Sequence, residues 1–411
     1  MSLITNKEKT NTYVGFLFFL IWPFLSFIIS FKKIGSQYFK TMLILFFGFF
    51  GYTYIYNSAS DSSRYASNFD KISQLSFNEF LETTKGIYST DGAKQDIFLD
   101  IISFIISRFI IDTRFFFMTL AIILGYLLLK NIQLLKSVYL QNRNSISLIF
   151  LIFFIVLIPP SRILSFRHYA ALLVFIYGVH RYFKQKNIQN FIIIFSSVFF
   201  HFSFIIAVFL FIFYQFIGNR NIVYYILIML SFLYSDIAIP LLRQISLGNE
   251  LLFNEIILGY TNEEYLDRIS ENQENRLLII NSYIRWTTLF FLISLIIHRL
   301  KSNNFDLISK KFYSFSLLFF VFVNFTRDME YITNRFGIMF QLFACLFFIY
   351  HYFNHKIGTV VFQIFSISFL ILYLVVLTRI TIEYANLLII SPFFPLAFMV
   401  NSDYTILDLI R

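Results

Sequence analysis

Long unbroken runs of apolar residues recur along this chain, and they constrain its fold more than any other feature. Three of these runs, 13–31, 277–297 and 356–377, approach the roughly 20 residues that a helix needs to cross a hydrocarbon layer about 30 Å thick. Because no water reaches that depth, the backbone must satisfy its hydrogen bonds within each segment, so each run is expected to be a helix. The sequence therefore predicts an all-α, polytopic membrane protein with a single integral membrane domain over 1–411.

The composition agrees with a membrane protein and argues against a nucleic-acid partner. Of the 411 residues, 58% are apolar and 14% are charged, whereas soluble domains carry about 25% charged residues. The net charge of +10 is spread over short basic clusters between apolar runs, which is the pattern of topology signals. The only cysteine, Cys345, lies inside an apolar run, so an intramolecular disulfide is excluded.

The distribution of charge predicts which gaps face the cytoplasm. Two long polar segments, 57–96 and 242–276, carry more acidic than basic residues and are expected to be extracytoplasmic loops. The short basic gaps contain a single acid, Asp306, and should be cytoplasmic. Their basic residues are Lys32, Lys33, Lys40, Lys130, Lys136, Arg143, Arg181, Lys184, Lys186, Arg299, Lys301, Lys310 and Lys311.

Threading the chain between these markers predicts about twelve spans, with both termini outside. The stretch 97–111 is too short and too charged for a crossing, and we expect a re-entrant or interfacial helix there. The stretch 188–217 is either two short helices that turn at His201 or one long tilted span; the basic cluster at 299–311 favours two. The expected spans are 13–31, which we take as a retained first span, 41–56, 115–135, 146–158, 168–183, 188–201, 203–217, 221–239, 277–297, 311–325, 335–353 and 358–377.

In this topology several arginines lie on the outer side or just within the membrane, against the positive-inside pattern. Placing an arginine at that depth costs free energy, and such an arginine usually pairs with another group. Each one either extends its guanidinium to the interface, pairs with a helix terminus, or binds an anion. The arginines are Arg64, Arg162, Arg167, Arg327, Arg335 and Arg379.

Arg162 and Arg167 flank the start of an expected helix that follows Pro159 and Pro160. The helix dipole disfavours a guanidinium at a helix N-terminus, so helix stability does not explain Arg167. An anion would reverse this penalty, because backbone N–H groups and a bidentate arginine together suit phosphate oxygens.

His201 lies at a turn between two aromatic runs at membrane depth. It either binds a carbonyl at a helix break or handles the proton of a substrate hydroxyl. Asp61 and Arg64 follow the second span, and their i, i+3 spacing favours a local salt bridge.

A mixed cluster of charges precedes the span that starts at 335. It contains Arg327, Asp328, Glu330 and Arg335, and its acids are either candidate general bases or ordinary solvated loop charges. The sequence has no Walker loop, no dinucleotide fingerprint, no cluster with metal-ligand spacing and no Gly-x-Ser-x-Gly elbow. We therefore expect neither a metal nor a cofactor.

Four short motifs around the residues discussed above, taken in their order along the chain, resemble those of the EpsG-like group of Wzy-type polysaccharide polymerases. The resemblance covers nearly the whole chain in layout, including the cytoplasmic cluster at 181–187. Two departures concern Arg167-His168, where the group usually has Arg-Gln, and the first motif, where the arginine more often precedes the aspartate. The motifs are Asp61-Ser62-Ser63-Arg64-Tyr65, Arg167-His168-Tyr169-Ala170, Phe200-His201-Phe202-Ser203 and Arg335-Phe336.

The resemblance implies a polymerase of O-antigen or capsule repeat units in the bacterial inner membrane. Such enzymes transfer glycan from undecaprenyl pyrophosphate to the non-reducing end of a lipid-linked repeat unit. Fixed cations suit the leaving pyrophosphate where water is scarce, and a base suits the acceptor hydroxyl. The expected partners are this lipid-linked oligosaccharide and the bilayer, with a chain-length regulator left open. The implied roles are catalysis by His201, Arg167 and Arg335, and substrate binding by Arg162, Arg64, Asp61 and Arg327.

Two other functions stay open at this point. A flippase for lipid-linked oligosaccharides also needs buried cations, although the paired repeats typical of alternating access are not visible in the sequence. A membrane acyltransferase that modifies glycans would use an arginine and a histidine, with acyl-donor entry from the cytoplasmic side. The fold class by itself does not decide among them.

Overall fold

The computed structural model is helical throughout the residues that it describes, which confirms the predicted all-α class. These residues are 6–56, 60–85, 97–141, 145–234, 240, 244, 277–301, 305–354, 360–392 and 404–410. Within them, β-type pairing is limited to isolated bridges between Tyr54 and Ala385 and between Asn386 and Thr405. The helices are α1 (Asn6–Ile21), α2 (Pro23–Ser30), α3 (Gln37–Tyr52), α4 (Asp61–Ser73), α5 (Phe77–Lys85), α6 (Phe98–Ser107), α7 (Thr113–Gln141), α8 (Ser145–Val156), α9 (Phe166–Lys184), α10 (Ile188–Phe200), α11 (Phe204–Ile217), α12 (Asn221–Leu233), α16 (Leu277–Lys301), α17 (Leu307–Phe325), α18 (Glu330–Asn354), α19 (Val360–Thr381) and α21 (Ile406–Ile410), with short 3-10 segments η1 (Phe31–Lys33), η2 (Pro160–Ser165) and η4 (Leu387–Ile389).

Six helical segments of the described residues are long and apolar enough to cross a membrane, so the chain is a multi-pass membrane protein. The count of twelve spans is not confirmed. Within the described residues, the crossings expected at 146–158, 188–201, 203–217 and 221–239 form helices of 12 to 14 residues. These helices are about 20 Å long at 1.5 Å per residue and are thus shorter than the hydrocarbon layer. The six segments are Thr113–Leu135, Pro160–Lys184, Tyr283–Lys301, Leu307–Phe325, Ile332–Tyr352 and Val360–Thr381.

The first expected span, 13–31, is divided into two helices at Pro23. Proline lacks the N–H that a helix interior needs, and Trp22 before it leaves the helical conformation. The Ser26 hydroxyl donates a hydrogen bond to the Gly15 carbonyl at 3.3 Å, whereas residues 11 apart in one helix would be about 16 Å apart. The chain therefore folds back at Trp22, and a continuous helix over 13–31 is wrong.

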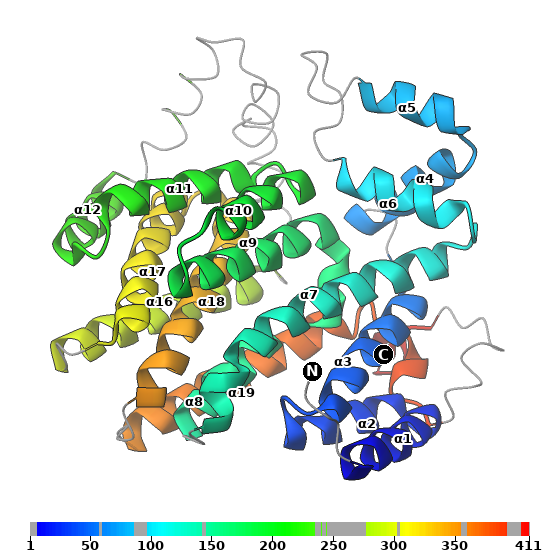
Figure 1. Cartoon of the computed structure of the whole chain (residues 1–411), viewed down its shortest axis with the longest axis horizontal. Helices are drawn as coiled ribbons and strands as arrows, with labels where there is room; N and C mark the ends of the chain where they lie inside the picture. Colours follow the sequence, from blue (N-terminus) through cyan, green and yellow to red (C-terminus); the bar gives the residue numbers. More distant parts are fainter. Residues whose placement is uncertain are drawn as a thin grey trace.

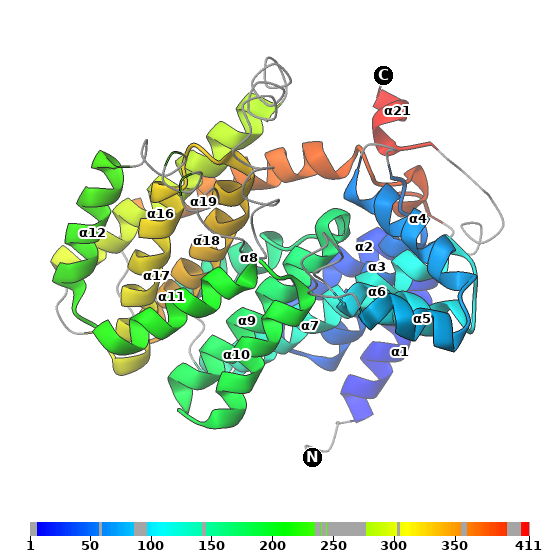
Figure 2. The same ribbon diagram turned by 90° about the horizontal axis from the view of Figure 1, so that it is seen from above.

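Figures 1 and 2 show α4, α5 and α6 grouped beyond the start of α7, to one side of the longer helices. Residues 60–85 of the expected outer loop 57–96 form α4 and α5, and the rest of that loop lies outside the described residues. The expected loop 242–276 also lies outside them apart from Gln244. The expected helix at 97–111 is α6, followed by the exposed side chains of Phe109 and Ile111.

The stretch 188–217 forms two helices, as the basic cluster at 299–311 indicated. His201 ends α10 with an extended backbone, and α11 begins at Phe204. Close packing of α9 on α10 depends on Gly178, because a Cβ there would lie 2.8 Å from the backbone nitrogen of Ile194. Small residues allow helices to approach in this way, so Gly178 helps to place the turn at His201.

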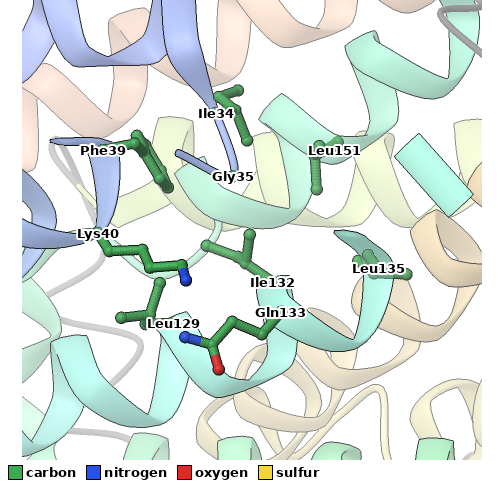
Figure 3. Close-up of a pocket in the computed structure, with 9 residues that line it drawn as sticks. All are labelled: Ile34, Gly35, Phe39, Lys40, Leu129, Ile132, Gln133, Leu135 and Leu151. Carbon is green, nitrogen blue, oxygen red and sulfur yellow. The ribbon is translucent and has the colours of Figure 1, made fainter. Parts of the chain in front are cut away.

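A pocket lies between the start of α3 and the second half of α7 (Figure 3). Its lining is mainly apolar, and Lys40 and Gln133 supply its polar side chains. Lys40 belongs to the start of α3, whereas the candidate site described below adjoins the end of that helix. The pocket is therefore separate from the site.

Candidate functional site

The start of α4 carries a carboxylate that contacts two arginines. Ser60 caps the helix, with its Oγ accepting a hydrogen bond from the Ser63 N–H, and an acid in the first turn is favoured by the helix dipole. That acid, Asp61, forms a salt bridge with Arg64 on the same turn, as predicted. Its other oxygen lies 3.7 Å from Nη2 of Arg335 in α18. Asp61 therefore joins the first motif of the chain to the last.

Side-chain hydrogen bonds fix α4 in place near its start and at its middle. Near its start, the hydroxyls of Tyr54 and Ser62 are 2.9 Å apart, which ties α4 to the end of α3. Farther along, Asn68 donates a hydrogen bond of 2.7 Å to the buried carboxylate of Asp100 in α6. A charge-assisted bond of this kind is stronger than a neutral one, so Asp61 is carried by a well-anchored helix.

Arg167 contacts α4 from the first turn of α9. Its Nε donates to the Tyr65 hydroxyl at 3.4 Å, and its Cζ lies 5.3 Å from the centre of the Tyr65 ring. Ser165, the cap residue of α9, makes no side-chain cap hydrogen bond. The Phe166 N–H at this helix start donates to the Ile163 carbonyl of η2, so the guanidinium of Arg167 is the group that suits an anion here.

His201 lies beside a second histidine, His168, in the first turn of α9. Their ring centres are 5.8 Å apart and the rings are nearly perpendicular. His168 also contacts Phe204 at the start of α11 and Phe336 next to Arg335 in α18. These contacts bring the turn at His201, the start of α9 and the start of α18 together.

Arg162 belongs to η2, just before α9, and its contacts are aromatic. Its Cζ lies 4.7 Å from the centre of the Tyr169 ring, and Nη2 donates to the Tyr373 hydroxyl of α19 at 3.3 Å. Its buried Nε has no hydrogen-bond partner in the described part of the chain. Aromatic rings stabilise a cation without neutralising it, so Arg162 retains its positive charge.

Two of the arginines noted in the sequence have contacts of a different kind. Arg327 lies in the turn before α18, where Nε is 3.8 Å from an Asp328 carboxylate oxygen and the carbonyl accepts a hydrogen bond from Arg285 of α16. These contacts connect the turn to α16. Arg379 forms a 2.7 Å salt bridge with Glu383, one turn further along the chain, which explains this arginine by local pairing.

Three side chains that contact the predicted site residues were not selected from the sequence. Tyr65 and Tyr373 are aromatic partners of arginines, and in a chain with 26 tyrosines their residue type carries no signal. His168 did carry a signal in the sequence, because it replaces the glutamine that usually follows the arginine at position 167 in the family that the chain resembles.

The contacts define a cluster in which positive charge exceeds negative charge. Helix starts of α4, α9 and α18 and the turn between α10 and α11 each contribute to it. Within the described residues, Asp61 is the carboxylate that pairs with its arginines. Such a site suits an anionic group with several oxygens, such as a phosphate or pyrophosphate. Its members are Arg64, Arg162, Arg167, Arg335, His168, His201 and Asp61.

The fold and the cluster define a multi-pass α-helical membrane protein with a cationic site formed by helix termini. The model of the EpsG family matches residues 38–398. The chain therefore belongs to the EpsG family, as its motifs indicated, and EpsG-like proteins are Wzy-type polymerases. No curated protein and no solved structure matches the chain.

Proposed function

We propose that this protein polymerises O-antigen or capsule repeat units at the outer face of the bacterial inner membrane. The observation that carries the proposal is the convergence of Arg167, Arg335 and His201 through contacts with α4 and with His168. These residues are distant in sequence, and membership of the EpsG family supports a polysaccharide polymerase. The acidic segments 57–96 and 242–276 would then be outer loops of one integral membrane domain over 1–411 with about twelve spans.

The substrates would be two lipid-linked oligosaccharides. The acceptor hydroxyl, at the non-reducing end of one repeat unit, attacks the anomeric carbon of the glycan on undecaprenyl pyrophosphate. The bond from that carbon to the pyrophosphate oxygen breaks, and undecaprenyl pyrophosphate leaves with the electron pair. His201 accepts the proton of the hydroxyl. A chain-length regulator remains a candidate protein partner, and the proposed reaction uses no cofactor or metal.

The arginines would stabilise the leaving group. Arg167 and Arg335 are assigned to the pyrophosphate oxygens, on which negative charge develops as the glycosidic bond breaks. Arg162 and Arg64 add positive charge, and Asp61 orients Arg335. Arg327, at the turn before α18, is assigned to the substrate at the edge of the site. Because these charges are held by folded helices, little reorganisation is needed during the reaction.

Replacing Arg167 with alanine tests the proposal. Arg181, at the other end of α9, is a matched control because it also lies over a tyrosine ring, 5.6 Å from its centre, and donates to the same tyrosine's hydroxyl. In a host lacking the native gene, we expect Arg167→Ala to reduce polymerisation about 100-fold or more, the scale of losing a donor to developing charge. Gels of the surface glycan would then show a single repeat unit, whereas Arg181→Ala should give long chains.

Membrane levels of both variants, measured by immunoblot, control for insertion. Wild-type chain lengths from Arg167→Ala at a normal level would contradict the assignment. Deletion of the gene distinguishes the other functions. Lipid-linked units trapped on the cytoplasmic side would indicate a flippase, and chains of normal length with altered decoration would indicate an acyltransferase.

A further inference from the structure

His168 is a buried polar group that the proposed reaction leaves without a role. His168 is 2% exposed, and in the described part of the chain neither ring nitrogen has a side-chain hydrogen-bond partner. Leaving a polar group buried and unsatisfied costs about 1–3 kcal/mol. The position of this histidine at the centre of the cluster therefore suggests a hydrogen-bond partner that His168 contacts only during the reaction.

The neighbours of His168 identify this partner. In the part of the chain that the structure describes, four rings surround the imidazole, those of Tyr169, His201, Phe204 and Phe336. Among them, His201 has nitrogens that can both donate and accept a hydrogen bond. Because the two imidazoles are already 5.8 Å apart between centres, rotation of the rings can bring a nitrogen of each together without movement of the backbone.

We propose that His168 is a positioning residue for His201, an inference that rests on the proposed role of His201 as the base. One nitrogen of His168 accepts a hydrogen bond from the inner N–H of His201. The outer nitrogen of His201 is then the basic one and faces the acceptor hydroxyl, since the bond made by one ring nitrogen decides the state of the other. When His201 takes the substrate proton, His168 continues to accept the inner N–H, and the hydrogen bond strengthens.

The charges around the pair come from three different segments. Arg335 of α18 and Arg162 of η2 face His168 together with His201 of the α10–α11 turn, and Tyr169 follows it on α9. The guanidinium groups of the two arginines have no acceptor atom, although the backbone of Arg335 makes a hydrogen bond with His168. Among the neighbouring side chains, His201 and Tyr169 can share a proton with the imidazole of His168.

Two substitutions separate hydrogen bonding from packing. His168→Phe keeps a ring against Tyr169, Phe204 and Phe336 but has no nitrogen. His168→Gln keeps an acceptor oxygen but has no ring, and glutamine is the residue usual at this position in the family. His168→Met, which is flexible and apolar, replaces His168→Phe if the latter does not accumulate in the membrane.

The experiment measures turnover of lipid-linked oligosaccharide by the full-length protein in vesicles, from pH 5 to pH 9. We expect His168→Phe to lower kcat about tenfold or more with little change in KM, and to shift the acidic limb of the pH profile. His168→Gln should keep kcat within a few-fold of the wild type, with its profile restored towards the wild type. His201→Ala should be inactive across the range.

Three outcomes would overturn the inference or its basis. A wild-type kcat and pH profile for His168→Phe, with His201→Ala inactive, would refute the role of His168 and leave the proposed function intact. Equal losses in His168→Phe and His168→Gln without a change in the pH profile would assign His168 to packing alone. Activity in His201→Ala would remove the proposed base itself, and with it any positioning role for His168.

Discussion

Asp61 contacts two arginines whose surroundings differ. Arg64, in the same helix, is 76% exposed, whereas Arg335 of α18 is 25% exposed. Water screens an exposed ion pair more strongly, so such pairs contribute little. Although Arg64 is the closer partner, the carboxylate should matter more for the orientation of Arg335.

A double-mutant cycle on polymerisation rates tests this difference. Asp61→Asn should lower kcat/KM, and its effect should be coupled to that of Arg335→Gln by about 1 kcal/mol, roughly a fivefold departure from additivity. The matched cycle uses Arg64→Gln and should be close to additive, because solvent screens that pair. Equal coupling in the two cycles, at normal membrane levels, would show that Asp61 does not selectively orient Arg335.

At the scale of single residues, the sequence indicated the charged residues of the site more reliably than the side chains that contact them. Arg167 and Arg335 were recognisable because arginines on the outer side of a membrane need an explanation. The contact between His168 and His201 depends on how α9 meets the α10–α11 turn, which no local pattern encodes. The roles of the site residues remain predictions.

At the scale of helices, the distance between α9 and α10 is set by a single glycine. A Cβ at Gly178 would lie 2.8 Å from the backbone nitrogen of Ile194, and backbone cannot move aside as a flexible side chain can. Any side chain at 178 therefore pushes the two helices apart. Since α10 ends at His201, this movement reaches the histidine pair.

Gly178→Ala should accordingly destabilise the protein and reduce polymerisation. Overpacking of a well-packed interface costs about 1–3 kcal/mol, and we expect a lower unfolding temperature in detergent together with shorter glycan chains. Gly337 in α18 is the matched control, because a Cβ there would meet its neighbours at ordinary distances of 3.6 Å or more. If Gly178→Ala unfolded at the same temperature as Gly337→Ala, the close approach would be unimportant.

The pattern of apolar runs predicted the helices more accurately than their number of crossings. The break at His201 was foreseen because the basic cluster at 299–311 favoured two helices over one long span. The break at Pro23 was missed, because hydropathy alone continues through a proline, whereas the backbone does not. Short helices such as α8 and α12 carry the expected apolar sequence, but their length does not determine how they sit in a bilayer.

At the scale of the molecule, function depends on which side of the membrane carries the cluster. The expected orientation puts Lys71 of α4 outside and Lys186, after α9, in the cytoplasm, and both side chains are exposed. The only native cysteine, Cys345, is buried. Cysteines introduced at these two positions can therefore be labelled against a low background.

With a membrane-impermeant maleimide, we expect Lys71→Cys to react in cells whose inner membrane is intact. Lys186→Cys should react only after that membrane is permeabilised, because positive-inside orientation keeps the basic gap in the cytoplasm. The reverse labelling pattern would place the cluster on the cytoplasmic side. A polymerase acting at the outer face would then be untenable.

The contact between Arg162 and Tyr373 has a consequence for the time at which the protein becomes active. Tyr373 is in α19, which follows every other element of the cluster in the sequence. Beyond α19, the Tyr384 carbonyl accepts a hydrogen bond from the Ile55 N–H, beside the anchor of α4. A chain still emerging from the ribosome lacks these contacts, so its cluster is incomplete. If the cluster has the proposed function, glycan transfer starts only after α19 has been inserted.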